Sequence, residues 1–225
     1  PYGAASSVNR GLWGVTIGGK ETLTSTGSIP DSAWVLSKDA FSKPRAATQH
    51  SIQFDEGRPV GVDGVQLSPV AVIEQLEALA APYGIGRGIH LGDTIIGTKG
   101  RVAFEAPAAE TLLVAHRELE KLVLTGRQQR IKESLAGPYG DWVHEGQLLD
   151  PVCRDIEALL VSSQERVTGT VHVTFRPGSL FVDGVDSVHS LMTASKGVYG
   201  EAAGEWTPAD ALGFSKIVSL TGMFH

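Results

Sequence analysis

Residues 51–65 read SIQFDEGRPVGVDGV, and this stretch decides the fold class. Apolar and polar residues alternate on both sides of the turn at residues 55–58, which is typical of a β-hairpin with one buried face. The pair Asp63–Gly64 favours a second tight turn, because such turns need a positive φ angle. Residues 171–184, VHVTFRPGSLFVDG, repeat the plan of strand, turn, strand and Asp-Gly. The sequence therefore predicts two antiparallel hairpins far apart in the chain.

Helical spacing of apolar residues occupies much of the sequence between these hairpins. Ser68 can cap a helix that begins at Pro69 and ends before Pro82. A second helix is predicted over residues 107–124, where apolar side chains recur on one face. A third helix is predicted to begin at residues 150–151.

The two ends of the chain complete the organisation. Residues 1–47 are rich in Gly, Ser, Thr and Pro and are expected to form an irregular N-terminal arm with short strands, followed by a main domain over residues 48–225. Residues 207–210 predict the start of a short helix, and residues 217–220 are expected to form a last strand. Hairpins interspersed with helices, without regular alternation, predict an α+β fold with a mostly antiparallel sheet and flanking helices.

Composition excludes several classes of protein. The net charge of −6 and the lack of a Lys/Arg cluster argue against a nucleic-acid or anionic-membrane surface. Every apolar run is shorter than the roughly 18 residues of a membrane span. The charge and the short apolar runs together lead us to expect no nucleic-acid or membrane partner. The single cysteine, Cys153, cannot form an intrachain disulfide, so we expect a reducing, cytoplasmic location. The start at Pro1 without a Met leads us to expect that the chain is part of a longer gene product.

Two glycine-rich segments invite a nucleotide-binding interpretation. Residues 14–21, GVTIGGKE, match the phosphate-binding pattern G-x-x-x-x-G-K-[ST] except at the last position. Glu21 would bring a carboxylate toward a polyphosphate in place of the hydroxyl that holds magnesium, so a flexible turn is the favoured reading. Residues 84–88 follow a predicted helix rather than a strand, which argues against a dinucleotide site.

No residue type in the sequence assembles into a recognisable catalytic or metal site. The seven histidines include no pair at i, i+4, and no G-x-S-x-G elbow is present. His116 lies on the apolar face of its helix and is interpreted as a core histidine, and Cys153 has apolar neighbours. We therefore assign no catalytic, cofactor-binding or metal-ligating residue. Residues 92–105 are dense in polar groups and glycine, and composition alone favours a solvated hairpin there.

Several short strings nevertheless resemble one family, the argininosuccinate synthases, in order and in separation from Ser7 to Phe214. The strings are GLWG at 11–14 with GKET at 19–22, LSP at 67–69, GIGR at 84–87, GTKGR at 97–101 with FE at 104–105, AH at 115–116, SQERVTG at 163–169 and TPADALGF at 207–214. The resemblance covers the C-terminal part of that enzyme.

The resemblance implies a function for the chain. Enzymes of this family join citrulline to aspartate with ATP, in arginine biosynthesis and the urea cycle. The ureido oxygen of citrulline attacks the α-phosphorus to give citrullyl-AMP and pyrophosphate, and the aspartate amine then displaces AMP. By resemblance, residues 48–225 are a synthetase and oligomerisation domain of a homotetramer. The family's S-G-G-x-D-[ST]-S loop is absent, so ATP with Mg is expected to bind mainly to a missing N-terminal domain, and this fragment alone is expected to be inactive.

The resemblance also implies contacts with citrulline. Ser7 and Thr16 fall where the family places two hydroxyl side chains on this substrate, and a hydroxyl can both donate and accept hydrogen bonds. Most members read V-E-N-R and then Tyr-Glu-Thr-Pro, whereas here Gly92 takes the place of the glutamate, Asp93 follows it, and Phe104 replaces the tyrosine. We expect Asp93 to take over the role of the glutamate and Phe104 to hold the aliphatic stem of citrulline.

Other roles remain open at the level of sequence. Lys99 and Arg101 are expected to stabilise loops or subunit contacts rather than to touch the nucleotide. One alternative function is a diverged, non-catalytic oligomerisation or binding module of the same fold, which Gly92 and Phe104 would permit. Another is an unrelated nucleotide binder that uses residues 14–21.

Overall fold

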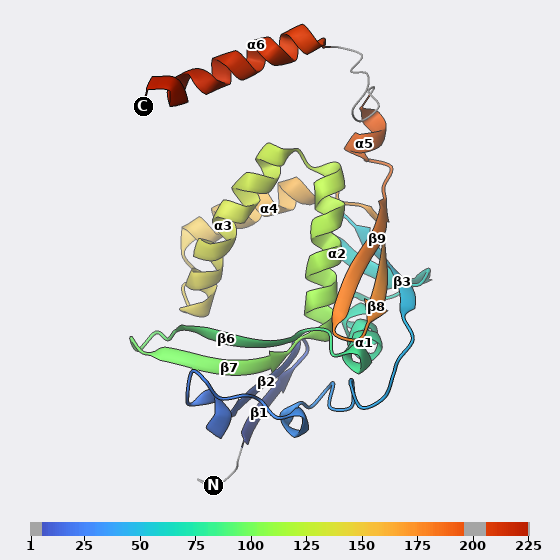
Figure 1. Ribbon diagram of the computed structural model, residues 1–225, viewed down its shortest axis with the longest axis vertical. Helices are drawn as coiled ribbons and strands as arrows, with labels where there is room; N and C mark the ends of the chain where they lie inside the picture. Colours follow the sequence, from blue (N-terminus) through green and yellow to red (C-terminus); the bar gives the residue numbers. More distant parts are fainter. Residues whose placement is uncertain (1–5, 196–205, 225) are drawn as a thin grey trace. The chain divides into compact units, whose positions relative to one another are not determined.

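Both predicted hairpins are present, and they lie in one five-stranded antiparallel sheet (Figure 1). The computed structural model describes residues 6–195 and 206–224. The first hairpin pairs with the second through its leading strand, because residues 48–54 run antiparallel to residues 169–175. The order is β5-β4-β3-β8-β9, with β3 at Thr48–Asp55, β4 at Arg58–Val62, β5 at Val65–Gln66, β8 at Gly169–Arg176 and β9 at Ser179–Asp186.

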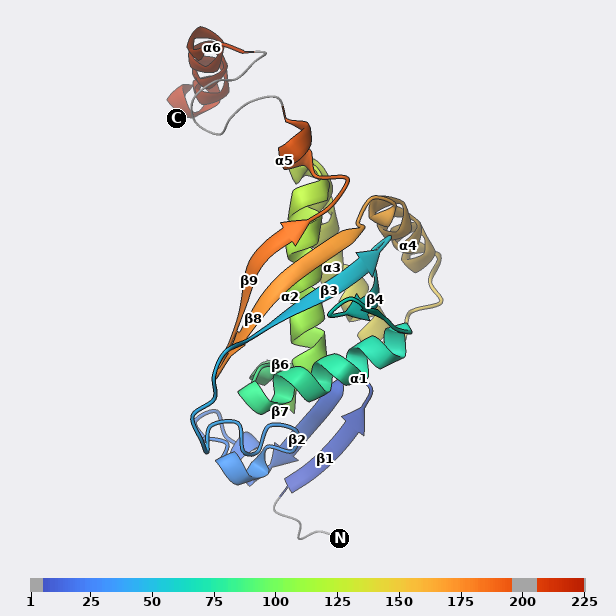
Figure 2. The ribbon, with the colours of Figure 1, turned by 90° about the vertical axis from the view of Figure 1, so that its right-hand side faces the viewer.

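Helices α1 (Pro69–Ala80) and α2 (Pro107–Val123) pack against this sheet and form the main core with it (Figure 2). The Ser68 hydroxyl caps α1 by accepting a hydrogen bond from the backbone N–H of Ala71, as the sequence predicts. Full burial of one large apolar side chain contributes about 1.5–3 kcal/mol, so the cluster dominates stability. Its largest fully buried members include Ile52, Leu76, Leu119, Val171, Val173 and Phe175.

A second antiparallel sheet, of four strands, has the order β1-β2-β7-β6. The short strands expected in the N-terminal arm are β1 and β2, while β6 and β7 form the hairpin expected near residues 92–105. The prediction of an α+β fold with antiparallel pairing and flanking helices is therefore confirmed, with the strands divided between two sheets. The strands are β1 at Ser6–Gly11, β2 at Gly14–Gly19, β6 at Arg87–Asp93 and β7 at Lys99–Glu105.

The segment after β2, residues 20–45, covers one face of this second sheet. Val15, Ile17 and Ala103 point into that face and are buried, and they pack in a small cluster with Trp34. The segment itself holds only two single-turn 3-10 helices, at Lys20–Thr22 and Asp31–Ala33. Side chains of the sheet must therefore fix its position.

Two charged side chains of the sheet, Glu105 and Arg101, fix the position of segment 20–45. The fully buried carboxylate of Glu105 accepts hydrogen bonds from the backbone N–H groups of residues 35–37 at 2.6–2.9 Å and from the Ser37 hydroxyl. The guanidinium of Arg101 holds the preceding loop by donating to the carbonyl oxygens of Glu21, Thr24 and Gly27. The expectation that Arg101 stabilises a loop is confirmed.

A third charged side chain connects β6 to the same segment. The guanidinium of Arg87 donates to the hydroxyl and the carbonyl oxygen of Ser37 and lies over the rings of Trp34 and Phe41. Ser37 thus lies between Arg87 and Glu105, so the buried negative charge has a positive partner one hydroxyl away.

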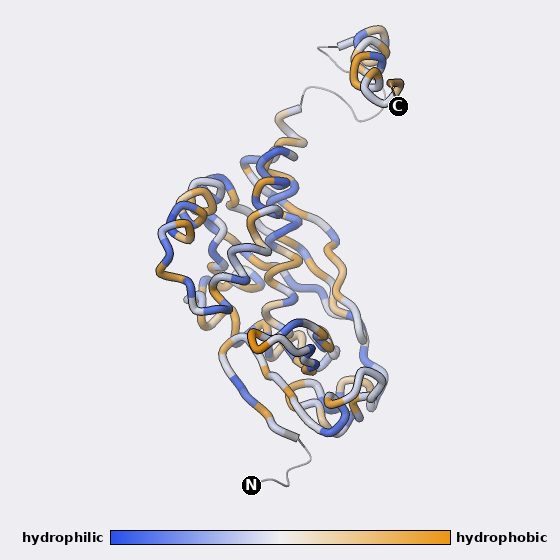
Figure 3. The backbone as a smooth tube through the Cα atoms, turned by 90° about the vertical axis from the view of Figure 1, so that its left-hand side faces the viewer, coloured by the Kyte–Doolittle hydropathy of each residue, from blue (hydrophilic) through white to orange (hydrophobic). Residues whose placement is uncertain are grey.

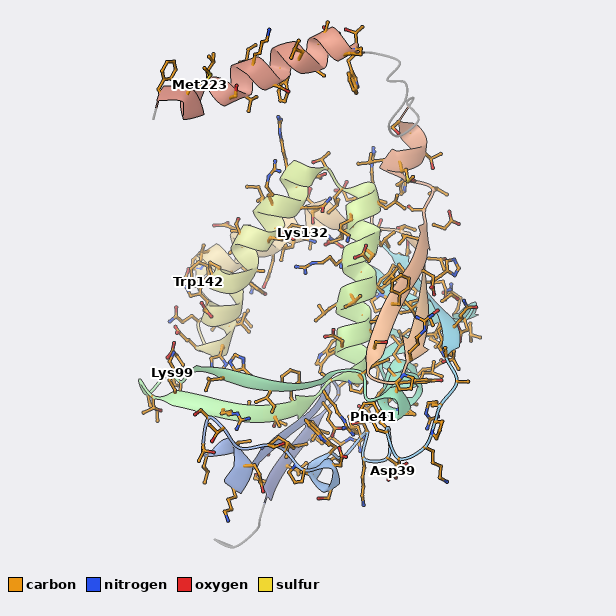
Figure 4. All side chains as sticks on the ribbon, in the orientation of Figure 1. Asp39, Phe41, Lys99, Lys132, Trp142 and Met223 are labelled. Carbon is orange, nitrogen blue, oxygen red and sulfur yellow. The ribbon has the colours of Figure 1, made fainter. Side chains whose placement is uncertain are left out.

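One long helix, α3 (Gly126–His144), was not expected from the sequence. None of its residues is buried, so it shows no continuous apolar stripe, and Pro138 lies inside it. Its N-terminus carries a recognisable signal, a capping box between Thr125 and Gln128. Lys132 points from α3 toward α2 and pairs with Glu120 there (Figure 4). The predicted third helix follows as α4 (Pro151–Gln164).

The chain divides into two compact units, Pro1–His189 and Ser190–His225. In the second unit, Leu191–Ala194 form α5, and Thr207 caps the predicted helix α6 (Pro208–Ser219) in a capping box with Asp210. The expectation of a last strand at residues 217–220 is wrong, because α6 continues through Ser219 and a 3-10 turn follows at Leu220–Phe224. The β-branched Ile217 and Val218 misled the prediction, and the cap decides the outcome.

Apolar and polar residues are interspersed along α6 and its 3-10 extension (Figure 3). The large apolar side chains there are all exposed within the described structure: Leu212, Phe214, Ile217, Val218, Leu220, Met223 and Phe224. Among the described residues, no helix combines the length and the apolar character needed to cross a membrane.

Candidate functional site

The second face of the four-stranded sheet brings together three of the residues singled out in the sequence. In Figure 1, α2 and α3 lie on the other side of β6 and β7 from segment 20–45, so this open face looks toward the helices. Thr16 on β2 stands directly opposite Phe104 on β7. Ser7 pairs with Gly18 and is therefore a diagonal neighbour of Thr16 on the same face.

Strand alternation explains this grouping. Val15 and Ile17 are buried under segment 20–45, so Thr16 between them must point the other way. Paired residues of adjacent strands stand on the same face. Phe104 pairs with Thr16, and Ser7 pairs with Gly18, which lies two residues from Thr16, so both side chains are on the open face. Ser7 and Thr16 are exposed and Phe104 is half-buried, so two hydroxyls and one aromatic ring are available to a ligand.

Asp93, the fourth residue expected at the site, lies on the opposite face. Gly88 is the partner of Phe104 in the continuous β6–β7 ladder, and Asp93 is the partner of Lys99. Because Asp93 follows Gly88 by an odd number of residues, its side chain stands on the other face from Phe104. Its carboxylate forms a 2.5 Å ion pair with the Lys99 ammonium, and both side chains are exposed. Lys99 lies near the tip of the hairpin (Figure 4). The geometry therefore does not place Asp93 with the other three.

Two glycines of β6 make room for rings on the open face. A Cβ atom added at Gly88 would overlap the ring of Phe104, and one added at Gly92 would overlap the imidazole of His90. The two rings therefore lie over these glycines, and the His90 imidazole covers the position where Gly92 lacks a side chain. Neither glycine has a positive φ angle, so space and not backbone conformation requires them.

His90 was not singled out from the sequence. It pairs with Val102 across the β6–β7 ladder and has the parity of Gly88 and Gly92, so its side chain stands on the open face and is exposed. The signal that could have found it is the pattern Gly-x-His-x-Gly at residues 88–92, in which a strand leaves a titratable side chain between two vacant positions of the same face.

Phe104 also borders a hollow of about 260 Å³ beside the sheet. The hollow is lined by Glu110 and Val114 from the first turns of α2 and by Gly178–Leu180 from the β8–β9 turn. Side chains of both sheets and of α2 thus converge next to the open face. The polar group that α2 contributes there is a carboxylate, which can accept a hydrogen bond from an ammonium or amide N–H.

The residues described do not fit a nucleotide phosphate site. Residues 14–19 form strand β2, whose backbone pairs with β1 on one side and β7 on the other, so its N–H groups are not collected around an anion. Gly84 ends a 3-10 helix with φ of 70° and serves as its cap. No cluster of His, Cys, Asp or Glu that could hold a metal ion occurs in the described ranges.

His116 is held inside the first unit, away from the open face. Its Nε2 atom lies 2.8 Å from the side-chain oxygen of Gln164, and its ring packs edge-on against Phe54. Burial lowers the pKa of His116 below the usual 6.5, against the opposing influence of the nearby Glu120 carboxylate. The histidine acts as a hydrogen-bonded structural residue, as its place on the apolar face predicts.

Comparison with known proteins identifies relatives of the whole chain. A family model described as the arginosuccinate synthase C-terminal domain matches residues 6–225. An argininosuccinate synthase of Xanthomonas campestris pv. campestris is 38% identical over 222 residues, which cover 98% of this chain and 55% of the relative. The enzyme of that name from Methanocaldococcus jannaschii is 37% identical over 185 residues, or 82% of this chain and 47% of the relative. The chain therefore spans about half the length of the curated relatives it matches.

Proposed function

The chain belongs to the family of argininosuccinate synthase C-terminal domains, and we propose that it supplies the citrulline-binding surface of an ATP-dependent carbon–nitrogen ligase of arginine biosynthesis. The proposed reaction joins citrulline to aspartate. One observation carries the assignment of the surface: Ser7, Thr16 and Phe104, chosen from the sequence, come from three adjacent strands and share the open face.

The chemistry of this face suits a polar amino acid with an aliphatic stem. The hydroxyls of Ser7 and Thr16 can donate to a carboxylate and accept from an ammonium, while the ring of Phe104 offers an apolar surface to methylene groups. Directly opposed side chains in a sheet are about 5 Å apart and diagonal ones about 7–8 Å apart, so the three span the length of one amino acid.

In the proposed reaction these residues bind and orient citrulline. The ureido oxygen attacks the α-phosphorus of ATP, pyrophosphate leaves, and the aspartate amine then displaces AMP. A rate gain from such a surface comes from holding the ureido oxygen in line with the phosphorus, because fixed orientation removes much of the entropic barrier. The hydroxyls and the ring act by position and take no proton in this scheme.

We place the nucleotide and its magnesium ion outside the described residues. The residues that best match a phosphate loop form strand β2, whose backbone is paired with β1 and β7. This pairing supports a nucleotide site outside the described residues. The complete enzyme in this proposal combines the present chain with an ATP-binding region. The free, buried thiol of Cys153 suits a reducing compartment, and the proposal includes a cytoplasmic location.

The proposal also includes assembly into a homotetramer. Helix α6 and its extension expose seven large apolar side chains, and a large exposed apolar patch marks an interaction surface more often than a free one. A surface of this kind is typical of a contact between subunits.

The direct test is product formation by the complete enzyme. With citrulline, aspartate and MgATP, it should release AMP and pyrophosphate in equal amounts with argininosuccinate, measured by chromatography. A complete enzyme that assembles normally but neither binds citrulline nor forms product would favour the alternative, a non-catalytic oligomerisation or binding module.

A further inference from the structure

We propose that His90 is a substrate-contact residue of this surface, and that its imidazole supplies the polar group that Gly92 lacks. The inference rests on the proposed function and deepens it, because it names the side chain that completes the recognition of the amino acid.

The first step of the argument is the register. Ser7, Thr16, Phe104 and His90 come from β1, β2, β7 and β6, so each strand of the sheet contributes at least one side chain to the open face. Phe104 pairs with Gly88, which makes His90 its diagonal neighbour. A ligand that lies across Thr16 and Phe104 therefore reaches His90 on the next strand.

The second step is the space around the imidazole. The ring lies over Gly92, where an added Cβ atom would overlap its Nε2 atom. The φ angle of Gly92 is one that other residues adopt, so the ring itself makes glycine necessary at this position. The sequence thus keeps position 92 empty and places a polar ring in the vacant volume.

The third step is the chemistry of the ring. Asp93, the nearest carboxylate along β6, points to the opposite face and is paired with Lys99. Neutral imidazole carries one N–H donor and one nitrogen acceptor, and the acceptor can bind an ammonium or ureido N–H. Among the described contacts, the His90 ring makes no hydrogen bond within the protein, so its hydrogen-bonding capacity is not used there.

The test measures steady-state kinetics of the complete enzyme carrying His90→Ala. We expect KM for citrulline to rise about tenfold or more, with KM for aspartate and for MgATP within twofold of wild type, because one directed hydrogen bond to the first substrate is lost. His90→Gln, which keeps a donor and an acceptor, should recover much of the affinity. Leu91→Ala is the matched control, since Leu91 is the next residue of β6 and is exposed on the other face.

A double variant separates contact from structure. Gly92→Glu alone should impair citrulline binding because its Cβ collides with the imidazole. Gly92→Glu combined with His90→Ala should bring KM for citrulline back toward the wild-type value, because the ring no longer blocks a carboxylate at position 92. If His90 were merely structural, the double variant would show a KM for citrulline no lower than that of His90→Ala alone.

The outcomes distinguish this inference from the proposed function. If wild type uses citrulline and His90→Ala does so with unchanged KM, the inference is wrong and the proposed function stands. If wild type neither binds nor uses citrulline, the proposed function fails, and the inference fails with it.

Discussion

Asp93 and Lys99 form a 2.5 Å ion pair across the β6–β7 hairpin, on the face of the sheet opposite to Phe104. Gly92 and Asp93 are adjacent in sequence, but a shift of one residue along a strand reverses the face on which a side chain stands. This relationship changes what a mutation at Asp93 should do.

Asp93→Ala should leave KM for citrulline in the complete enzyme within about twofold of wild type. The sequence alone leads to the opposite expectation, a large rise in this KM with little change for aspartate. Exposed ion pairs contribute at most about 1 kcal/mol, so the fold should also be little affected. Steady-state kinetics with citrulline as the varied substrate decides the matter. A tenfold rise confined to citrulline would place Asp93 at the site after all.

Gly88→Ala should raise KM for citrulline several-fold. The added Cβ would overlap the Phe104 ring, so the ring must leave its position beside Thr16. Gly137→Ala is the control, because a Cβ there meets nothing in the exposed helix α3. Kinetics and thermal unfolding should be measured together. A variant with normal KM but lowered melting temperature would mean that the Phe104 ring supports the fold and not the substrate.

Glu105→Gln should destabilise the protein by about 2–4 kcal/mol. The neutral amide cannot accept all the hydrogen bonds that the carboxylate takes from residues 35–37. Denaturant unfolding followed by circular dichroism measures the difference. Glu110→Gln, at an exposed carboxylate, should change stability by less than about 0.5 kcal/mol. Equal effects in the two variants would show that the buried carboxylate does not anchor segment 20–45.

His116 should make the protein less stable as the pH falls below about 6.5. Burial lowers the pKa of this residue in the folded state, so at mildly acidic pH the unfolded chain binds more protons than the folded one. The stabilising contribution is complete above the unfolded pKa and is lost as the pH falls through the folded pKa. The free energy of unfolding should be measured from pH 7.5 to 5. His116→Asn should have a flatter profile over this range, and an unchanged slope would rule out His116 as its source.

Ile217→Ser with Val218→Ser should weaken assembly. Both side chains are exposed on α6, so the change should cost little in the folded subunit but remove apolar area from a subunit contact. Light scattering after size-exclusion chromatography should show smaller species than wild type at the same concentration. Lys216→Ser is a neighbouring polar control. A double variant with the wild-type mass would place the subunit contacts elsewhere.

Local signals in the sequence were sufficient for much of the fold. The Asp63–Gly64 turn, the alternating residues of the two hairpins, and the caps at Ser68 and Thr207 act within a few residues of the elements they specify. Helix α3 could not be found in this way, because it buries no side chain and therefore shows no apolar stripe. The extent of α6 was misjudged because two β-branched residues near its end favour a strand in isolation.

The candidate site depends on pairings that no local signal contains. The neighbours of Thr16 follow from the ladder between β2 and β7, whose strands are far apart in sequence. The resemblance supplied Ser7, Thr16 and Phe104, but only the register shows that they share a face and that Asp93 does not. His90 was overlooked for the same reason, because its importance lies in the empty position beside it.

The central claim is that citrulline binds to the open face of the four-stranded sheet. The most direct measurement is a calorimetric titration of the complete enzyme with citrulline, comparing wild type with Thr16→Val, which removes the hydroxyl and keeps the shape of the side chain. The account predicts saturable binding by wild type and affinity at least tenfold weaker in the variant. Equal affinity in the two proteins, or no binding by a correctly folded wild type, would contradict it.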